Sequence, residues 1–284
     1  MSEQPDYESY PPAFRPSSVN PNHGGVEKES PEMEAAEGDG GVPVIDFECM
    51  KKDEEKVTEA CREWGFFRLV NHGIPESLMS QMLECSRELF SMAYEAKQAA
   101  FNSAAAPAAG PSISYFWGTP AVTPSGAALA SSNLHWMEGL NVPLNKVSQL
   151  HYEDPMLESF RSLLEEYGKH QARVGKAIYE ALWRKLELGT LKMSKFEESA
   201  KYLSEDTGIL RAISDDKYVS VKHRVKVNEE KERISVGYFV FPGDDVVIES
   251  SKYKPFTYAQ FRAQVQHELK SVGFKIGLHN FKRP

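Results

Sequence analysis

The sequence predicts an α+β fold, because segments with helical spacing and segments with strand-like alternation occur in one chain of 284 residues. The predicted helices are residues 53–62, 76–95, 155–188 and 194–203. The predicted strands are residues 65–70, 221–227 and 233–242. With 41% hydrophobic residues the chain can bury a substantial core, most simply as one domain with an N-terminal extension.

The two C-terminal strands are predicted to place three polar side chains on one buried surface. A strand alternates its faces with period two, so His223 shares a face with valines, and Arg233 shares one with Ser235. A polar turn at 228–232 joins the two runs and brings these side chains together. A guanidinium makes two parallel hydrogen bonds to a carboxylate, and the Ser235 hydroxyl adds a third. The pattern predicts a small-acid site. A protein carboxylate beside Arg233 and a core role for His223 are the alternatives.

This region resembles the C-terminal core of plant 2-oxoglutarate and Fe(II)-dependent dioxygenases. The resemblance rests on SVKHRV at 220–225, on Arg233-x-Ser235 and on GYFVFP at 237–242. It implies that His223 is the last iron ligand, and that Arg233 and Ser235 bind the distal carboxylate of 2-oxoglutarate. Fe(II) and 2-oxoglutarate are thus the implied cofactors, with ascorbate as a further candidate.

The resemblance extends over most of residues 42–284. VPVIDF at 42–47 and EWGFFRLVNHGIP at 63–75 are similar to the N-terminal region of the family, and residues 251–277 are similar to its closing segment. The implied fold is a double-stranded β-helix, a jelly roll of the isopenicillin N synthase type, with flanking helices. The predicted parts are a disordered N-terminal extension at 1–41, an N-terminal dioxygenase-type region at 42–150, a helical region at 151–211 and part of the core at 212–284.

One family segment is missing between Arg211 and Ala212. Residues 202–211 resemble the family just before its first core strand, whereas residues 212–218 resemble the stretch just before the last iron histidine. The several dozen family residues between them include a His-x-Asp pair, which supplies the other two ligands of the 2-His-1-carboxylate site. The jelly-roll core is therefore expected to be incomplete, and catalysis to be lost or strongly reduced.

No other part of the chain offers a convincing replacement for the missing ligands. None of the eight histidines is followed two residues later by aspartate, and His151-Tyr-Glu153 is the one His-x-acid triplet. That triplet lies directly before a helix start with a capping aspartate and a proline, so a loop-to-helix boundary explains it better. Asp215 and Asp216 are likewise predicted to be turn residues.

The resemblance also implies a substrate class and leaves three hypotheses about activity. YFWGTP at 115–120 and HWMEGLNVP at 135–143 look most like gibberellin 2-oxidase-like enzymes, with flavonoid-oxidising members as the nearest alternative. The chain is an enzyme with unexpected iron ligands, a non-catalytic relative that binds a small acid or regulates intact enzymes, or the product of exon skipping or a gene-model error. Strands without neighbours are expected to favour self-association.

Composition narrows the partners and the location. A net charge of −8 and a pI near 5.6 argue against nucleic acid. Three scattered cysteines predict neither a disulfide framework nor a zinc site. No apolar run approaches membrane-spanning length, and the polar first residues lack the features of a secretory signal, so we expect a cytoplasmic protein with a small-molecule substrate.

Overall fold

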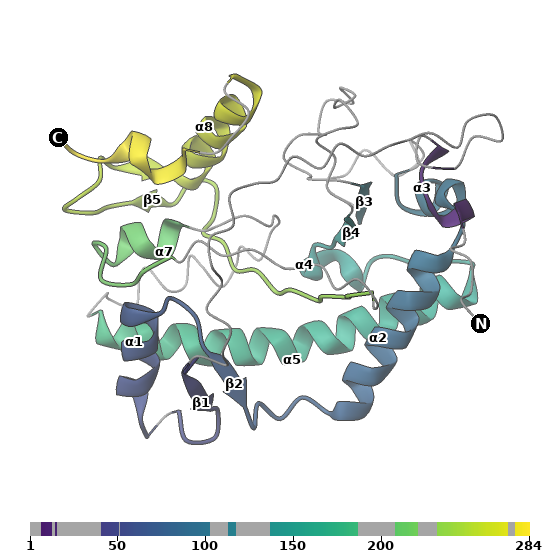
Figure 1. Cartoon of the computed structure of the whole chain (residues 1–284), viewed down its shortest axis with the longest axis horizontal. Coiled ribbons are helices and arrows are strands. Elements are labelled where there is room, and N and C mark those ends of the chain that lie inside the picture. Colours follow the sequence, from purple (N-terminus) through teal and green to yellow (C-terminus); the bar gives the residue numbers. More distant parts are fainter. Residues whose placement is uncertain are drawn as a thin grey trace.

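The structure is a computed structural model in which helices predominate (Figure 1). It describes residues 7–12, 15, 41–50, 52–102, 113–117, 137–186, 208–220, 232–271 and 276–284. Within these residues the strands form three separate two-stranded sheets. The α+β class is therefore present in the described parts of the chain, with short strands and long helices.

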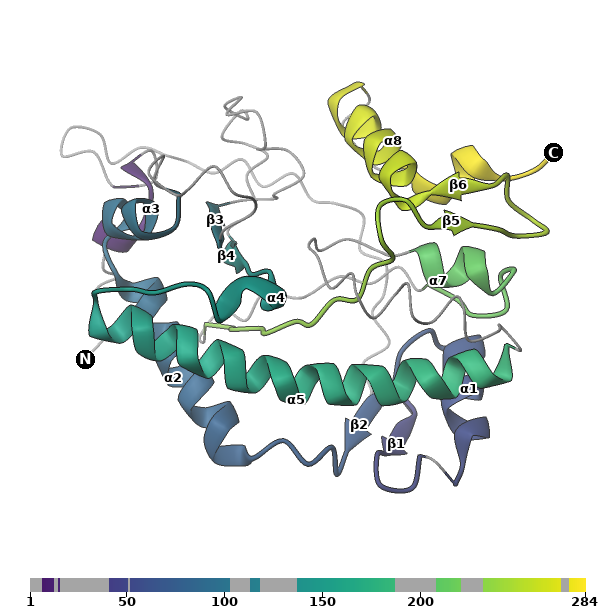
Figure 2. The ribbon, with the colours of Figure 1, turned by 180° about the vertical axis from the view of Figure 1, so that it is seen from behind.

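The longest helix, α5 (Pro155–Lys185), crosses the molecule, and the other elements gather along it (Figures 1 and 2). Its start is built as the sequence predicts: the Asp154 side chain accepts a hydrogen bond from the Leu157 backbone N–H at 3.0 Å, and proline occupies the first turn. Arg184 and Lys185 lie in the last turn, where positive charge suits the helix dipole. Apolar residues of α5 that are buried include Phe160, Leu164, Val174, Ala181 and Leu182.

A small β-α-β unit packs against the C-terminal half of α5. Strand β1 (Val44–Asp46) pairs in parallel with β2 (Arg68–Val70), and α1 (Glu54–Glu63) connects them. Apolar side chains from this unit, including Ile45, form one buried cluster with Leu182 of α5. The helix and the strand predicted for this region are confirmed, with slightly different ends.

The opposite end of α5 is covered by a second group of elements. These are α2 (Glu76–Ser91), α3 (Tyr94–Asn102), the antiparallel strands β3 (Ser114–Trp117) and β4 (Glu138–Asn141), and α4 (Leu144–Val147). The single helix predicted at 76–95 is two helices, because the backbone becomes extended at Met92 (ψ 152°). Leu89, Ile113 and Phe160 lie at the centre of the core that these elements share.

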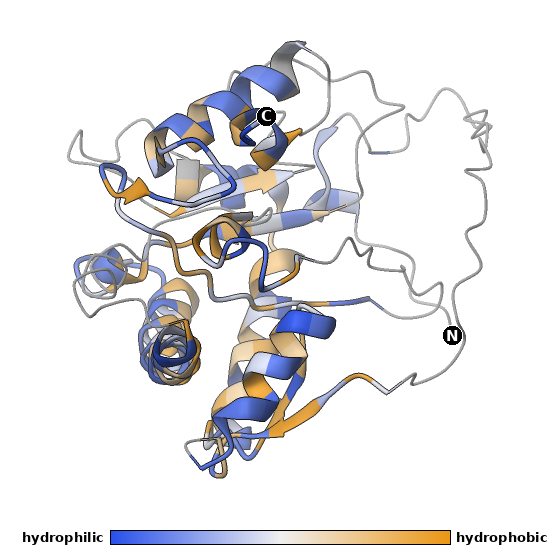
Figure 3. Ribbon diagram, turned by 90° about the vertical axis from the view of Figure 1, so that its left-hand side faces the viewer, coloured by the Kyte–Doolittle hydropathy of each residue, from blue (hydrophilic) through white to orange (hydrophobic). Residues whose placement is uncertain are grey.

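The C-terminal elements form a third group. They are α7 (Gly208–Ile213), the antiparallel strands β5 (Val247–Ile248) and β6 (Phe256–Thr257), α8 (Tyr258–Ser271) and the 3-10 helix η4 (Gly277–Phe281). Trp183 of α5 is buried in their core beside Phe241 and Phe256. In Figure 3 hydrophilic and hydrophobic residues alternate along the turns of α8 and α1, as expected of helices with one packed face.

The N-terminal extension is not disordered throughout. Residues 7–9 form the 3-10 helix η1 (Tyr7–Ser9), and residues 7–12 and 15 pack near α3 and β3. The expectation of a disordered segment at 1–41 is therefore corrected for these residues. Aromatic and arginine side chains, which provide contact area and directed hydrogen bonds, hold them in place.

The double-stranded β-helix implied by the resemblance is not confirmed by the described residues. The predicted strand at 233–242 is an extended segment without a strand partner among them, and its predicted partner, 221–227, lies outside the described residues, as does the helix predicted at 194–203. What the structure does place is the helical frame: α5, the helices that pack on it, and the C-terminal group.

We expect Gly65→Ala to destabilise the protein more than Gly41→Ala. Gly65 has a φ of +74°, and a Cβ there would lie 2.6 Å from the Val219 carbonyl oxygen. Gly41 has a similar φ of +69° but nothing within 4 Å of its Cβ position, so Gly41→Ala measures the backbone cost alone. Urea unfolding should show an extra loss of about 1–3 kcal/mol for Gly65→Ala. Equal losses in the two variants would contradict the close approach.

A buried carboxylate joins α8 to the C-terminal segment. Glu268 is only 2% exposed, and its oxygens accept hydrogen bonds from the backbone N–H groups of Ile276 at 2.6 Å and Gly277 at 2.9 Å. The side-chain amides of Gln264 and Asn280 donate to the same carboxylate. Burial by itself raises the pKa of Glu268, but these hydrogen bonds outweigh it and hold the pKa below its ordinary value.

Because the pKa of Glu268 is lowered on folding, its ionised form stabilises the protein above about pH 4.5, the ordinary value. This stability is lost as the pH falls toward the lowered pKa. We expect Glu268→Gln to lower the free energy of unfolding at pH 7 by about 1–3 kcal/mol and to flatten the fall in melting temperature between about pH 5 and 3. Exposed Glu249→Gln is the matched control in circular dichroism melts. Identical acid profiles for the two variants would refute this role of Glu268.

Candidate functional site

The segment that carries the predicted small-acid residues, 232–242, runs along α5 (Figure 1). Its start is tied to α2 by an ion pair in which the Arg87 Nε and a Glu232 carboxylate oxygen are 2.6 Å apart. Farther along, the Tyr238 ring lies against α5 at Gly175, where an added Cβ would come within 3.0 Å of the ring. Glycine at position 175 thus allows the segment to approach the helix closely.

One side of this segment is packed on the frame and the other is open to solvent. Tyr238 and Val240 are half-buried toward α5, whereas Arg233 and Ser235 are exposed and Phe239 is 46% exposed. On an extended segment, residues two apart leave the backbone on the same side, so Arg233 and Ser235 lie next to each other. The structure corrects one expectation: these side chains are exposed, not turned into an apolar interior, because the described residues provide no second layer over them.

Stacked aromatic rings connect the exposed side of the 232–242 segment with the core. Phe239 stacks on Phe241 with ring centroids 6.2 Å apart, and Phe241, which is 2% exposed, stacks on Tyr258 at 5.5 Å. Gly237 makes room for the Phe239 ring, since a Cβ there would lie 2.9 Å from it. The end of the segment is therefore anchored firmly, and Arg233 and Ser235 lie ahead of this anchor.

His223 lies outside the described residues, so its role as an iron ligand stays a prediction. The approach to it is described as far as Ser220. The Val219 backbone N–H donates to the Cys61 carbonyl at 3.0 Å, and Tyr218 is buried at 2% exposure beside α1. The chain therefore enters the stretch that contains His223 from the C-terminal end of α1.

The join between the two family-like segments lies inside a helix. Arg211 and Ala212, the residues predicted to flank the gap, are neighbours within α7. Ile209 is 3% exposed and Ala212 is fully buried, and both belong to the C-terminal core. The joined residues thus pack as one helical turn.

Asp215 and Asp216 are turn residues, as the sequence predicts. Both have positive φ angles, 52° and 62°. The Ser250 hydroxyl and the Ser251 backbone N–H donate to Asp215 at 2.5 and 2.7 Å, and Tyr253 donates to Asp216 at 2.7 Å. For both carboxyls burial raises the pKa, but the hydrogen bonds outweigh it and lower the pKa overall. These carboxylates fasten the turn after α7 to the segment that follows β5.

The described residues do not fit an iron site. Among them, no group of three histidine, cysteine, aspartate or glutamate side chains could hold a metal ion. His151 is exposed, and its Nδ1 lies 3.4 Å from the Glu158 carboxylate, which also accepts a hydrogen bond from the Tyr152 backbone N–H. His151 and the exposed Glu153 therefore belong to the start of α5, and the alternative ligand pair is not supported.

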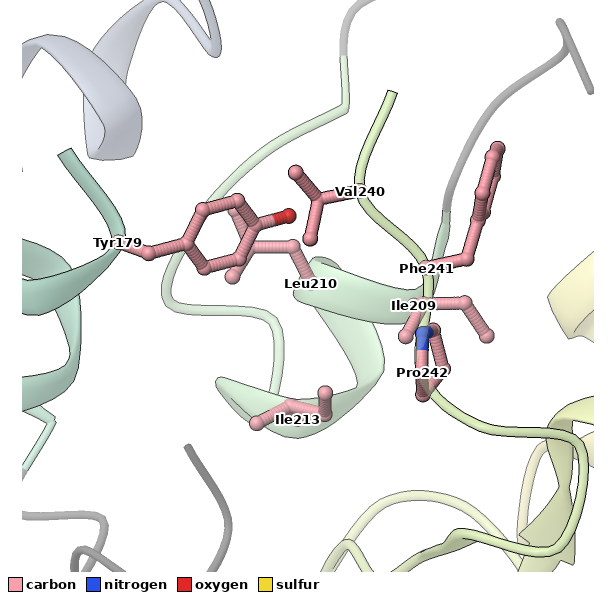
Figure 4. A pocket seen from close by; sticks show the side chains of 7 residues that line it. All are labelled: Tyr179, Ile209, Leu210, Ile213, Val240, Phe241 and Pro242. Atoms are coloured by element: carbon pink, nitrogen blue, oxygen red, sulfur yellow. The ribbon is translucent and has the colours of Figure 1, made fainter. Parts of the chain in front are cut away.

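A small apolar pocket lies between α5, α7 and the end of the 232–242 segment (Figure 4). Its volume is about 10 Å³, the space of a single water molecule. The Tyr179 hydroxyl points toward Val240 at its edge, and burial raises the pKa of Tyr179 to about 12. With Ile209, Leu210 and no charged group in its lining, this pocket is too small and too apolar to hold a dicarboxylate.

Comparison with known proteins assigns the class. Residues 42–155 match the family described as the N-terminal region of non-haem dioxygenases in morphine synthesis, and residues 194–242 match the 2OG-Fe(II) oxygenase superfamily. Together with the relatives below, these matches show that the chain belongs to the plant 2-oxoglutarate and Fe(II)-dependent dioxygenases. Iron and 2-oxoglutarate are the cofactors of this family.

Curated relatives come from two groups of plant oxygenases. Gibberellin 2-beta-dioxygenase 8 of Arabidopsis thaliana is 25% identical over 309 residues, which include 84% of this chain and 86% of the relative. Jasmonate-induced oxygenase 1 of the same species is 26% identical over 337 residues, with 92% and 79% covered. Sequence identity therefore does not distinguish the gibberellin group from the jasmonate group as the nearer relatives of this chain.

Solved structures show the same fold. The crystal structure of JOX2 in complex with 2OG, Fe and JA has a TM-score of 0.61 at 20% identity and covers 86% of this chain and 89% of that one. The dioxygenase for auxin oxidation in rice has a TM-score of 0.53 at 16% identity, with 85% of this chain and 100% of that one covered.

In the part of the chain that the structure describes, no helix is both long and apolar enough to cross a membrane.

The alignments also contain many positions without a residue of this chain. For gibberellin 2-beta-dioxygenase 8, 84% of 284 residues is about 239 residues, whereas the alignment has 309 positions, which leaves about 70 without a counterpart. For jasmonate-induced oxygenase 1, 92% is about 261 residues against 337 positions, which leaves about 76. About 70 to 76 aligned positions of these relatives thus have no counterpart in this chain.

We expect Arg233→Ala to leave stability almost unchanged, because the exposed guanidinium forms no ion pair with another described residue. Its unfolding free energy should stay within about 0.5 kcal/mol of the wild type in urea titrations. Arg161→Ala is the matched comparison, since the Arg161 side chain is only 14% exposed and pairs with Glu158 at 2.8 Å and Glu165 at 3.0 Å. A loss for Arg233→Ala as large as that for Arg161→Ala would show a structural role instead.

Proposed function

We propose that this chain is a 2-oxoglutarate and Fe(II)-dependent dioxygenase that has lost most or all of its capacity to oxidise a small plant metabolite. The observation that carries this is the absence of a His-x-Asp pair from the whole sequence, which leaves His223 as the one family ligand. One imidazole holds Fe(II) weakly, because useful affinity comes from several ligands fixed together. The roughly 70 unmatched alignment positions support a deletion as the cause.

The ancestral substrate that we propose is of gibberellin type. The motifs at 115–120 and 135–143 support this class, as does the similarity to gibberellin 2-beta-dioxygenases. The jasmonate-induced oxygenases, which match at similar sequence identity, make a jasmonate-type substrate the second candidate. Flavonoids remain a third, on the sequence motifs alone.

Residual binding of a small dicarboxylate is the function that Arg233 and Ser235 would support in this form. Both are exposed and adjacent on the 232–242 segment, so they remain free to meet a carboxylate from solution. Much of the affinity for 2-oxoglutarate would come from chelation by iron, so we expect the metal-free binding to be weak. Such a protein would act as a cytoplasmic binder or regulator of intact relatives.

Two further proposals follow from the open side of the segment and from the join. Val236 and Phe239 are 42% and 46% exposed, which supports self-association through this side. The direct connection of two family segments at Arg211 and Ala212 supports exon skipping or a gene-model error over gradual decay. Sequencing transcripts across these two codons distinguishes a real short form from an error.

The decisive experiment is an anaerobic titration of the purified chain with Fe(II) and 2-oxoglutarate. A complete site gives a visible charge-transfer absorption when both are bound, because the metal and the chelating acid form one chromophore. We expect no such absorption from this chain at concentrations that saturate a complete relative, and weak metal-free binding of 2-oxoglutarate that Arg233→Ala removes.

Circular dichroism must first show that the chain is folded. An absorption band that appears with both ligands and disappears in His223→Ala would overturn the proposed loss of activity, because it would reveal an alternative ligand set. Metal-free binding that Arg233→Ala leaves intact would instead locate the small acid elsewhere in the protein.

A further inference from the structure

The N-terminal arm, residues 7–12 and 15, lies ahead of the segment that matches the dioxygenase family, which begins at residue 42. It is folded against elements that do belong to that segment. This inference concerns only the arm and its contacts, so it does not depend on whether the chain binds iron or 2-oxoglutarate.

Arg15 connects the arm to α3 and also shapes the arm itself. Its Nη2 donates to both carboxylate oxygens of Glu95, each at 2.8 Å. The same guanidinium donates to the backbone carbonyls of Tyr10 at 2.9 Å and Glu8 at 3.2 Å. One side chain thus closes the arm into a compact turn and attaches that turn to the helix. Arginine suits both roles because its donors are held in a rigid planar fork.

A buried lysine receives the arm from the other side. Lys97 of α3 is fully buried, and its Nζ donates to the Ser9 carbonyl of the arm at 3.0 Å. It also donates to the Phe90 carbonyl at the end of α2, at 2.7 Å, and pairs with the Glu138 carboxylate of β4 at 3.0 Å. The Tyr115 hydroxyl of β3 donates to the same carboxylate at 2.6 Å. Lys97 therefore connects the arm, two helices and the β3–β4 hairpin.

An aromatic contact completes the set. The Tyr10 and Trp117 rings meet edge to face with their centroids 5.5 Å apart. Pro11, which follows Tyr10, is buried. The three groups that receive the arm are thus a carboxylate, an ammonium group and an indole, and they come from α3 and β3 alone.

We propose that Glu95, Lys97 and Trp117 form a peptide-binding surface, which the chain's own N-terminal arm occupies as a strap that fastens α3 to the β3–β4 hairpin. Each group recognises a different chemical feature: Glu95 the guanidinium, Lys97 a backbone carbonyl and Trp117 a tyrosine ring. The partner that fits is a short peptide with tyrosine and proline adjacent and arginine five residues after the tyrosine, which is the pattern of residues 10–15. Release of the arm would uncover the Lys97–Glu138 pair on the side that Ser9 covers.

Charge-reversal variants of the full chain test the proposal. The measurement is hydrogen–deuterium exchange of the backbone amides in the arm. Arg15→Glu and Glu95→Arg each replace the ion pair with a repulsion. Both should raise the exchange rate of the amides of residues 7–10 by about fivefold, which corresponds to roughly 1 kcal/mol for a favourable exposed pair. The double variant restores opposite charges and should return the exchange rate toward that of the wild type. Glu95 is mostly exposed, so these changes spare the core.

Glu84→Arg, a charge reversal at an exposed position of α2, is the matched control and should not alter the arm. Arm amides that exchange in the wild type as fast as an unfolded peptide would overturn the proposal, as would single variants without effect. Protection that disappears on dilution, together with a dimer in light scattering, would show that the arm docks on a second copy and would overturn docking within one chain.

Discussion

The burial of the apolar side chains of α5 is the interaction on which the rest of the structure depends. Different residues of this helix contribute to different cores: Phe160 to the core with α2 and β3, Leu182 to the core with α1 and β1, and its neighbour Trp183, on another side of the same turn, to the C-terminal core. The β-α-β unit and the group around α2 both pack on α5, and Trp183 of α5 is buried in the core of the C-terminal group (Figures 1 and 2). A single amphipathic helix therefore positions both ends of the molecule and supports the 232–242 segment along its length.

The C-terminal group is ordered around the join at Arg211 and Ala212. Both residues lie inside α7, where Ala212 is fully buried, and the Asp215 and Asp216 carboxylates fasten the turn after α7 to the segment that follows β5. These contacts lie between residues of α7, the turn after it and the segment after β5. Farther along the chain, the side of 232–242 that carries Arg233 and Ser235 is exposed.

Much of the frame could be predicted from the residues because its information is local. The start of α5 depends on Asp154 and a proline next to it, and its burial depends on a repeat of apolar residues that any helix would present on one face. The turn at Asp215 and Asp216 could also be predicted from local sequence. The contacts of Lys97 could not be predicted, because Ser9 and Glu138 are distant in sequence, and a lysine in a polar stretch is usually solvated.

The sequence by itself determined the family, the helices and the lack of a His-x-Asp pair, since each is a property of residues that are neighbours along the chain. Only the tertiary structure decided that Arg233 and Ser235 are exposed, that the join lies inside a packed helix, and that the N-terminal arm folds back onto α3. The physical reason is that exposure and docking depend on which distant segments cover a side chain. A periodic pattern shows that a face is apolar, but not whether another layer is present to bury it.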